Sequence, residues 1–381
     1  MKSALTIADL KEMARRRVPK MFFEYADSGA LSEQTYRANE SDFEKILFRQ
    51  RVARKLSNRS LKSAMIGEEV SMPLALAPTG MTGFQHANGE MLAAKAAENF
   101  GVPFVLSTMS ICSIEDVKSV TSNPFWFQLY VMRDRGFVKS LLDRARDAGC
   151  SALVLTMDLQ VLAQRHKDLR NGLSAPPKFI PKHLWQMATR PGWCLGMATT
   201  RRHGFGNIIG HAKGVGDLGS LSEWTAKQFD LELSWDDVDW IKDYWGGKLI
   251  IKGVLDVADA KHAVDTGADA LIVSNHGGRQ LDGAWSSIRA LPHIVEAVGE
   301  DIEVHMDGGI RSGVDIARAI ALGAKGTYIG RPFLYGLGAG GEAGVKRVLD
   351  ILYAELDMTM ALGGERDIAD FGAHNIASIE F

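Results

Sequence analysis

Short apolar segments alternate with helix-like segments along most of this chain, and this alternation restricts the fold more than any other feature. From Met72 onward, eight β-favouring segments recur, at Leu74–Pro78, Phe104–Thr108, Trp126–Val131, Ala152–Asp158, Leu249–Gly253, Ala270–Asn275, Glu303–Gly309 and Gly326–Gly330. Helix-like segments lie between them, such as Glu90–Phe100, Ile114–Val120, Phe137–Ala148, Val257–Thr266, Ile288–Val298 and Val314–Leu322. The alternation predicts a parallel sheet with crossover helices, and eight units close most simply as an α/β fold of the (β/α)8 type, a TIM barrel. An open doubly wound sheet is the alternative, but the segment after the first strand lacks the glycine-rich dinucleotide fingerprint.

Additional segments are expected before and within the barrel. Thr6 starts a capping pattern for one N-terminal helix, a second helix follows Pro19, and a third is predicted from Glu33 to Phe48. About 90 residues separate the fourth and fifth predicted strands, far more than a normal strand-to-helix connection. We therefore expect a single domain over residues 1–381, with the barrel at about 72–335 and a lid-like insertion after strand four at about 171–230.

Composition excludes several classes of protein. The formal net charge of -2 and the absence of a basic tail argue against a nucleic-acid partner. Three scattered cysteines indicate a reducing, cytoplasmic location and argue against a disulfide framework or a zinc site. No apolar run is long enough to span a membrane. The insertion nevertheless carries Leu184, Trp185 and Trp193 near Arg190, so it could rest on the inner face of the plasma membrane or pack against the domain or a neighbouring subunit.

Polar residues and glycines stand at the ends of all eight predicted strands, where barrels of this kind hold their chemistry. In chain order they are Pro78, Thr79 and Gly80; Ser107; Gln128 and Tyr130; Thr156 and Asp158, with Arg165 soon after; Lys252; Ser274, His276 and Arg279; Asp307, Gly308, Gly309 and Arg311; and Gly330 and Arg331. Each of them alone could be a cap, a turn or a surface charge. Together they predict a ligand.

The residue types indicate which ligand this is. His276 can take a proton near neutral pH, and Arg279 offers a planar fork that matches a carboxylate, although a capped loop with a solvated arginine is the alternative for this stretch. Glycines and arginines after strands seven and eight suit a phosphate. Hydroxyls and an amide on strands two to four suit the edge of a flat heterocycle, and Lys252 would stabilise an anionic form of it. No metal-ligand spacing is present. The pattern predicts a phosphorylated redox cofactor of flavin type.

The motifs resemble those of the FMN-dependent L-2-hydroxy-acid dehydrogenase and oxidase family. Ser274 to Asp282 reads Ser-Asn-His-Gly-Gly-Arg-Gln-Leu-Asp and matches the family's most specific motif throughout. Further matches are Trp126 to Tyr130, Pro78 to Gly80, Lys252-Gly253, Asp307 to Arg311 and Gly330-Arg331. The resemblance is closest to bacterial respiratory L-lactate dehydrogenases, notably at Ser107 to Cys112 and Gln164 to Asp168.

This resemblance implies oxidation of L-lactate to pyruvate with FMN, and roles for the residues at the strand ends. His276 would accept a proton while flavin N5 receives the hydride or its equivalent, and Asp158 would orient the imidazole and stabilise its protonated form. The substrate would be held by Tyr25, Tyr130, Arg165 and Arg279. FMN would be held by Pro78, Thr79, Gly80, Ser107, Gln128, Thr156, Lys252, Ser274, Asp307, Gly308, Gly309, Arg311, Gly330 and Arg331. Tyr25 is otherwise expected to be a core aromatic.

The resemblance leaves the electron acceptor and the exact acid open. A quinone or cytochrome would make the enzyme a dehydrogenase, whereas O2 would make it an oxidase of the glycolate or lactate type; mandelate dehydrogenase activity is a further alternative. Met81, Phe84 and Leu162 are expected to line a substrate pocket that favours lactate. The family also suggests a homotetramer. A non-redox FMN isomerase and a barrel that serves only as a scaffold are less consistent with the pairing of His276 and Arg279.

Overall fold

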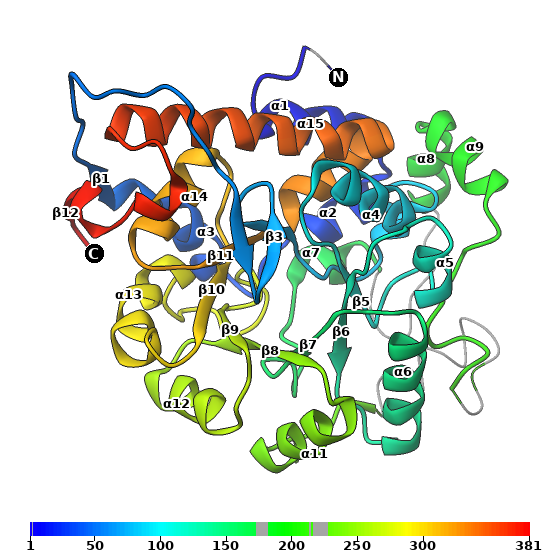
Figure 1. The fold of residues 1–381 in the computed structure, drawn as a ribbon. Helices are drawn as coiled ribbons and strands as arrows, with labels where there is room; N and C mark the ends of the chain where they lie inside the picture. Colours follow the sequence, from blue (N-terminus) through cyan, green and yellow to red (C-terminus); the bar gives the residue numbers. More distant parts are fainter. Residues whose placement is uncertain (2, 173–181, 213–214, 216–227) are drawn as a thin grey trace.

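The computed structural model describes residues 1, 3–172, 182–212, 215 and 228–381, and it confirms the predicted barrel (Figure 1). The eight parallel strands are β4 (Leu74–Leu76), β5 (Val105–Ser107), β6 (Trp126–Tyr130), β7 (Ala152–Thr156), β8 (Lys248–Val254), β9 (Ala270–Val273), β10 (Glu303–Asp307) and β11 (Gly326–Ile329). They pair in the order β4-β11-β10-β9-β8-β7-β6-β5, and a parallel bridge between Leu76 and Phe104 joins the two ends. The sheet therefore closes on itself.

Helices alternate with these strands as the sequence predicts. They are α4 (Gly89–Phe100), α5 (Ile114–Lys118), α6 (Arg135–Asp147), α11 (Trp235–Trp245), α12 (Val257–Asp265), α13 (Ser287–Val298), α14 (Gly313–Ala321) and α15 (Arg331–Gly363). Capping boxes at Ser113 and Ser312 begin α5 and α14, since each serine accepts a bond from a backbone N–H one turn into its helix. Two glycines with non-helical backbone angles, Gly340 and Gly341, kink α15.

The N-terminal segment confirms two predicted helices and corrects the third. Thr6 caps α1 (Ile7–Arg17), which lies beside α15 (Figure 1), and α2 (Lys20–Ala26) follows Pro19. The predicted helix from Glu33 to Phe48 is wrong in its second half, because α3 (Gln34–Ser41) gives way to a 3-10 helix (Asp42–Lys45) and to β1 (Ile46–Phe48). β1 pairs antiparallel with β12 (Ile376–Ile379), so its backbone bonds come from the far end of the chain. Further 3-10 helices are Thr82–Phe84, Ile368–Asp370 and Ala373–Asn375.

Among the described residues, a hairpin closes one end of the barrel. A hairpin of β2 (Ser63–Met65) and β3 (Glu68–Val70) covers the end where the strands begin. Met65 at its tip is fully buried with the apolar side chains of the barrel interior. The indole of Trp126 donates to Glu68 at 3.1 Å, and the Lys248 ammonium donates to the Ile66 carbonyl at 2.6 Å. These contacts fasten the hairpin to the strand starts. The opposite end of the barrel, where the strands have their carboxyl ends, is not covered by this hairpin.

Alternation along each strand separates the barrel interior from its helix-covered exterior. On β6, Trp126 points to the interior with Tyr328 of β11, whereas Phe127 and Leu129 pack in the outer core beneath the helices. The same alternation continues toward the carboxyl ends, where Gln128 and Tyr130 follow Trp126 on the inner side. Gln128 and Tyr130 therefore belong to the interior layer nearest the carboxyl end of β6.

The insertion between β7 and β8 is described in part. It contains α7 (His166–Arg170), α8 (Lys182–Ala188) and α9 (Pro191–Thr199), while residues 173–181, 213–214 and 216–227 of the predicted 171–230 insertion lie outside the described residues. α8 and α9 stand at the edge of the molecule (Figure 1), where Leu184, Trp185 and Leu195 are 59%, 73% and 68% exposed. Among the described helices, none is both long and apolar enough to cross a membrane.

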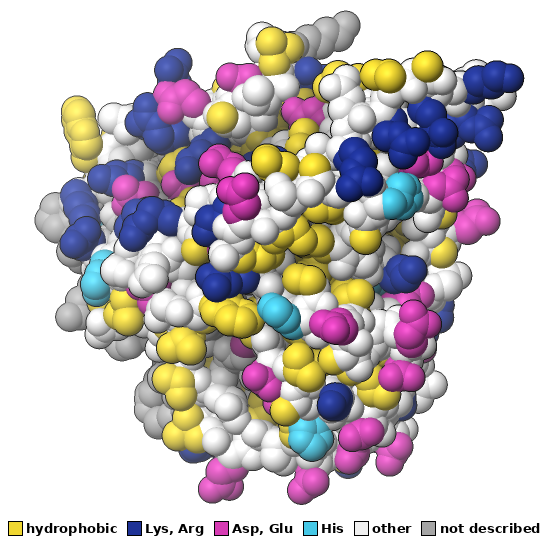
Figure 2. Space-filling model, turned by 90° about the vertical axis from the view of Figure 1, so that its left-hand side faces the viewer, with side chains coloured by type: hydrophobic (Ala, Val, Ile, Leu, Met, Phe, Trp, Pro, Cys, Tyr) yellow, Lys and Arg dark blue, Asp and Glu magenta, His cyan; other side chains and the backbone are white. Residues whose placement is uncertain are grey.

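The surface shown in Figure 2 carries charged side chains of both signs. Acidic and basic residues are interspersed, and hydrophobic side chains gather toward the middle of this face. A uniformly basic surface is not seen on this side, in keeping with the formal net charge of -2.

Candidate active site

A cavity of about 400 Å³ opens at the carboxyl ends of the barrel strands and collects most of the predicted site residues. Those that line it are Tyr25, Pro78, Thr79, Gly80, Tyr130, Arg165, Lys252, His276, Arg279, Asp307, Gly308, Gly309, Arg311, Gly330 and Arg331. The other predicted residues, Ser107, Gln128, Thr156, Asp158 and Ser274, lie directly behind this wall. Cations outnumber anions along the lining, so the cavity suits a ligand that carries negative charge.

His276 and Asp158 form the central pair of the site. His276 Nδ1 lies 2.8 Å from Asp158 Oδ1, which joins the loop after β9 to the loop after β7. Burial raises the pKa of Asp158, but the contact with His276 and the charge of Lys252 outweigh burial, so the net pKa is lowered and the carboxylate is ionised. An ionised Asp158 accepts a hydrogen bond from the Nδ1–H group, which leaves the other nitrogen, Nε2, as the basic one.

The backbone at His276 is in an unusual conformation that aims the imidazole. Its φ of 58° lies in the left-handed region, which costs a non-glycine residue about 1–3 kcal/mol unless the surroundings impose it. The backbone N–H of His276 donates to Ser274 Oγ at 3.1 Å, and Gly253 clears space for Asp158, since a Cβ at Gly253 would lie 2.7 Å from that of Asp158. Strain held in this way is typical of a functional residue.

Burial lowers the pKa of His276 below its ordinary value. Asp158 opposes this shift, whereas the nearby charge of Lys252 adds to it. The imidazole is therefore neutral at neutral pH and able to accept a proton.

Lys252 places a buried positive charge on the floor of the cavity. Its ammonium lies 3.1 Å from Asp307 Oδ2 and donates to Ser274 Oγ at 2.9 Å. Burial alone would lower the pKa of Lys252, but Asp307 and Asp158 outweigh it and raise the pKa, so the charge persists. One residue, Ser274, thus fixes both the lysine and the loop that carries His276.

Three neutral side chains form a chain of hydrogen bonds across the ends of β5, β6 and β7. Ser107 donates to Gln128 Oε1 at 3.0 Å, and Gln128 Nε2 donates to Thr156 Oγ1 at 3.0 Å. All three are almost fully buried. This chain of bonds fixes which atoms of each residue are donors and which are acceptors, as recognition of the polar edge of a heterocycle requires.

The ends of β10 and β11 form the other part of the cavity. Gly308 and Gly309 have φ values of 92° and 86°, and a Cβ at Gly309 would lie 1.9 Å from the Asn39 carbonyl, so no side chain fits there. The guanidinium of Arg331 donates to three carbonyls, those of Ala26, Gly277 and Ser28. Arg331 therefore also ties the N-terminal segment to the barrel, and some of its donors are already used.

Arg165, Arg279 and Tyr25 meet on the side of the cavity that faces the insertion. The Arg279 guanidinium stacks over the Tyr25 ring at 4.8 Å, and its Nη1 donates to the Tyr25 carbonyl at 2.6 Å. Burial and the charge of Arg165 lower the pKa of Arg279 to about 10, which still leaves it charged at neutral pH. Arg165 Nε is buried and has no hydrogen-bond partner among the described residues. Tyr25 lines the cavity and is not the core aromatic expected from local sequence.

Some residues at the site were not found by sequence reasoning. Phe205 and Phe229, from the insertion, join the predicted Met81, Phe84 and Leu162 on the apolar wall of the cavity. Asp168 lies 3.6 Å from Arg165 and bonds to Ser28, which is a partner of Arg279. A lone aromatic in a long insertion gives no signal of its own, whereas the three-residue spacing of Arg165 and Asp168 could have indicated a pair on one helical turn.

Comparison with known proteins identifies the family. Residues 14–378 match the family described as FMN-dependent dehydrogenase. The chain belongs to this family. It is 48% identical over 364 residues to an L-lactate dehydrogenase of Haemophilus influenzae (strain PittEE), covering 95% of each chain.

Solved structures agree with this assignment. The crystal structure of the monotopic membrane protein (S)-mandelate dehydrogenase matches with a TM-score of 0.93 and 35% identity, over 99% of this chain and 100% of that one. A mandelate oxidase bound to (S)-2-phenylpropionate matches with a TM-score of 0.82 and 32% identity, over 99% of this chain and 98% of that one.

The residues of the cavity fit FMN, the cofactor of the family. Asp307 Oδ1 is buried on the cavity wall and has no hydrogen-bond partner among the described residues, so it can accept a bond from a ribityl hydroxyl. The glycine backbone beside it leaves room for a close approach, and Arg311 and Arg331 supply charge for a phosphate. The roles of individual residues toward FMN stay predictions.

Proposed function

We propose that the chain oxidises L-lactate to pyruvate with FMN and passes the electrons to a quinone or cytochrome. The observation that carries the proposal is the 2.8 Å contact of Asp158 with His276, beside two arginines in one cavity. A base next to a double carboxylate clamp suits a small 2-hydroxy acid. The 48% identity to an L-lactate dehydrogenase supports lactate as that acid.

In the proposed reaction, L-lactate loses two electrons and two protons. FMN, when bound, would accept both electrons and one of the two protons, as a hydride or its equivalent. Arg165, Arg279 and Tyr25 hold the carboxylate, and Tyr130 donates to the substrate oxygen, because burial raises the pKa of Tyr130 and keeps it protonated. His276 Nε2 accepts a proton, and Asp158 stabilises the imidazolium that results. The apolar wall with Phe205 and Phe229 limits access of water to these groups.

Anaerobic mixing with L-lactate tests the proposal. We expect the visible flavin absorbance of the purified holoprotein to bleach with L-lactate and to stay unchanged with D-lactate, since the base and the clamp define one face of the substrate. Bleaching with (S)-mandelate and not with L-lactate would change the substrate and keep the mechanism. Absence of bleaching with any 2-hydroxy acid would reject the proposal.

Reoxidation of the bleached protein tests the acceptor. Slow recovery in air and fast recovery with a soluble quinone or a cytochrome would support a dehydrogenase. Immediate recovery in air with release of hydrogen peroxide would instead make the chain an oxidase.

We also propose that α8 and α9 rest on the surface of an anionic membrane, on the cytoplasmic side. Trp185, Leu184 and Leu195 are exposed there, and neither helix contains an acidic residue. Apolar side chains beside Arg190 suit a lipid interface, and the structural relative is described as a monotopic membrane protein. The homotetramer stays a prediction.

Sedimentation with vesicles measures this membrane contact. The holoprotein is expected to co-sediment with phosphatidylglycerol vesicles more than with phosphatidylcholine vesicles, and a variant with Leu184→Ser and Trp185→Ser should lose several-fold of the bound fraction. Leu281→Ser removes an apolar side chain that is 74% exposed elsewhere, and it serves as the control. Equal sedimentation of all three proteins would contradict the proposal.

A further inference from the structure

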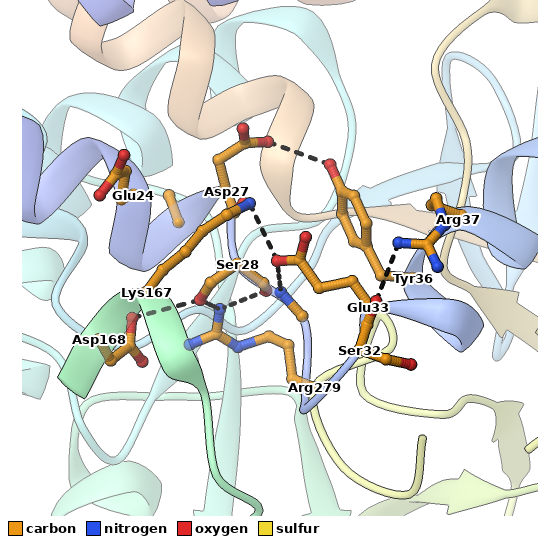
Figure 3. Close-up of polar contacts among 12 residues, drawn as sticks. Glu24, Asp27, Ser28, Ser32, Glu33, Tyr36, Arg37, Lys167, Asp168 and Arg279 are labelled. Carbon is orange, nitrogen blue, oxygen red and sulfur yellow. Dashed lines mark hydrogen bonds and ion pairs between the residues drawn. The ribbon is translucent and has the colours of Figure 1, made fainter. Parts of the chain in front are cut away.

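A buried polar cluster contacts the two arginines of the proposed carboxylate site, and Figure 3 shows it beside Arg279. It consists of Ser28, from the loop after α2, and Asp168, from α7 in the insertion. Ser28 is fully buried and Asp168 is 7% exposed. Both side chains stand outside the cavity lining, so any effect of theirs on a ligand acts through the arginines.

Asp168 reaches one arginine directly and the other through Ser28. Its Oδ2 lies 3.6 Å from Arg165 Nη1. Its Oδ1 lies 3.3 Å from the Ser28 hydroxyl, which in turn accepts a bond from Arg279 Nη1 at 3.1 Å. In Figure 3, dashed lines run from Asp168 to Ser28 and from Ser28 to Arg279. Each arginine thereby has a partner that does not line the cavity.

All the bonds of Arg279 to Ser28 and Tyr25 use Nη1. Its Nε and Nη2 are therefore left to meet a ligand, as is the unpartnered Nε of Arg165. Two guanidinium groups repel each other in a buried site, and a carboxylate between them offsets that repulsion. Burial raises the pKa of Asp168 above its ordinary value, and the charges of Arg279 and Arg165 offset only part of this rise.

We propose that Asp168 is a positioning residue that, with Ser28, holds Arg165 and Arg279 in the arrangement in which both bind the substrate carboxylate. This inference rests on the proposed function, because it takes a 2-hydroxy acid as the substrate. Asp168 itself touches neither substrate nor cofactor in this arrangement.

The sign of the effect separates positioning from electrostatics. Asp168→Asn removes one negative charge beside an anionic substrate, so Coulomb attraction alone predicts tighter binding and a lower KM. Positioning predicts the opposite, because the arginines lose the anchor that orients them. A 2-hydroxy acid without correct orientation binds weakly even in a more positive site.

Lys167 provides a matched control on the same helix. Its ammonium lies 2.9 Å from Glu33 and donates to the Asp27 carbonyl at 3.0 Å, so it fastens α7 to the same N-terminal loop (Figure 3). It contacts neither arginine in the bonds that the structure describes. If Asp168 acted only by docking α7, Lys167→Met would reproduce its effect.

The test uses the FMN-loaded enzyme and two readouts. These are the KM and kcat for L-lactate, and the Kd of oxamate, a carboxylate that is not oxidised, from its perturbation of the flavin spectrum. For Asp168→Asn, both KM and Kd are expected to rise by about 10- to 100-fold, with a smaller change in kcat. Ser28→Ala, which leaves the charge unchanged, should raise both several-fold, and Lys167→Met should leave both within about twofold of wild type.

An unchanged or lower KM and Kd in Asp168→Asn would overturn the inference, as would an equal loss in Lys167→Met. If Asp168→Asn fails to bind FMN, Ser28→Ala decides, and wild-type KM and Kd in that variant would also overturn it. Failure of the proposed function is distinct, because the wild-type flavin would then not be reduced by L-lactate at all.

Discussion

Replacing His276 by glutamine is expected to lower kcat by about 10²–10⁴-fold while the protein keeps its FMN. Glutamine is close to histidine in size and keeps a polar side chain beside Asp158, so the loop after β9 should stay in place. It cannot accept a proton at neutral pH, which removes the proposed general base. The measurements are steady-state turnover with an artificial acceptor and the flavin content of the purified protein.

His293→Gln gives the matched control for this substitution. His293 lies on α13 and does not line the cavity. Its ring centroid is 5.5 Å from that of Trp285. Its replacement should leave kcat unchanged. Turnover of His276→Gln within about tenfold of wild type would assign the base to another group.

Asp158→Asn is expected to lower kcat by about 10²–10³-fold, since it removes the charge that stabilises the imidazolium as it forms. It should also change the pH dependence. His276 must be unprotonated to act as the base, so activity is lost as the pH falls through its pKa. Burial already lowers that pKa in the wild type, which places the acid limb below about 6.5.

Asp158 raises the pKa of His276, so removing its charge should move the acid limb of kcat/KM to still lower pH. The measurement is a pH profile of kcat/KM for both proteins, together with thermal unfolding to exclude a loss of fold. An acid limb that stays in place, or moves to higher pH, would show that Asp158 does not set the charge state of His276.

The barrel could be predicted from the sequence because each of its strands and helices is specified by a local pattern of apolar residues. Each strand is a short apolar run followed by an amphipathic helix, and eight repeats admit few other closures. The segment from Glu33 to Phe48 failed for the opposite reason. Its last residues are a strand only because β12, more than 300 residues later in sequence, completes their hydrogen bonds. No local pattern reports a partner at that distance.

The same distinction between local and distant information applies to the residues of the site. Residues that continue the inner face of a strand, such as Gln128 and Lys252, could be found from alternation alone. The left-handed backbone of His276 could not, because a histidine adopts it only under the constraint of its neighbours. The proposed positioning role of Asp168 could not be predicted either, because it depends on a hydrogen bond from Ser28 in the distant N-terminal loop.

The bonds of Arg331 to the N-terminal segment also determine when the site can form during synthesis. Its Nε donates to the Ala26 carbonyl at 3.0 Å, across 305 positions of the chain. At about 5–20 residues per second, roughly 15–60 s separate the translation of these two partners. Ala26 and Ser28 therefore leave the ribosome long before Arg331, which binds their carbonyls. A nascent chain therefore cannot complete the cavity until β11 and Arg331 have emerged.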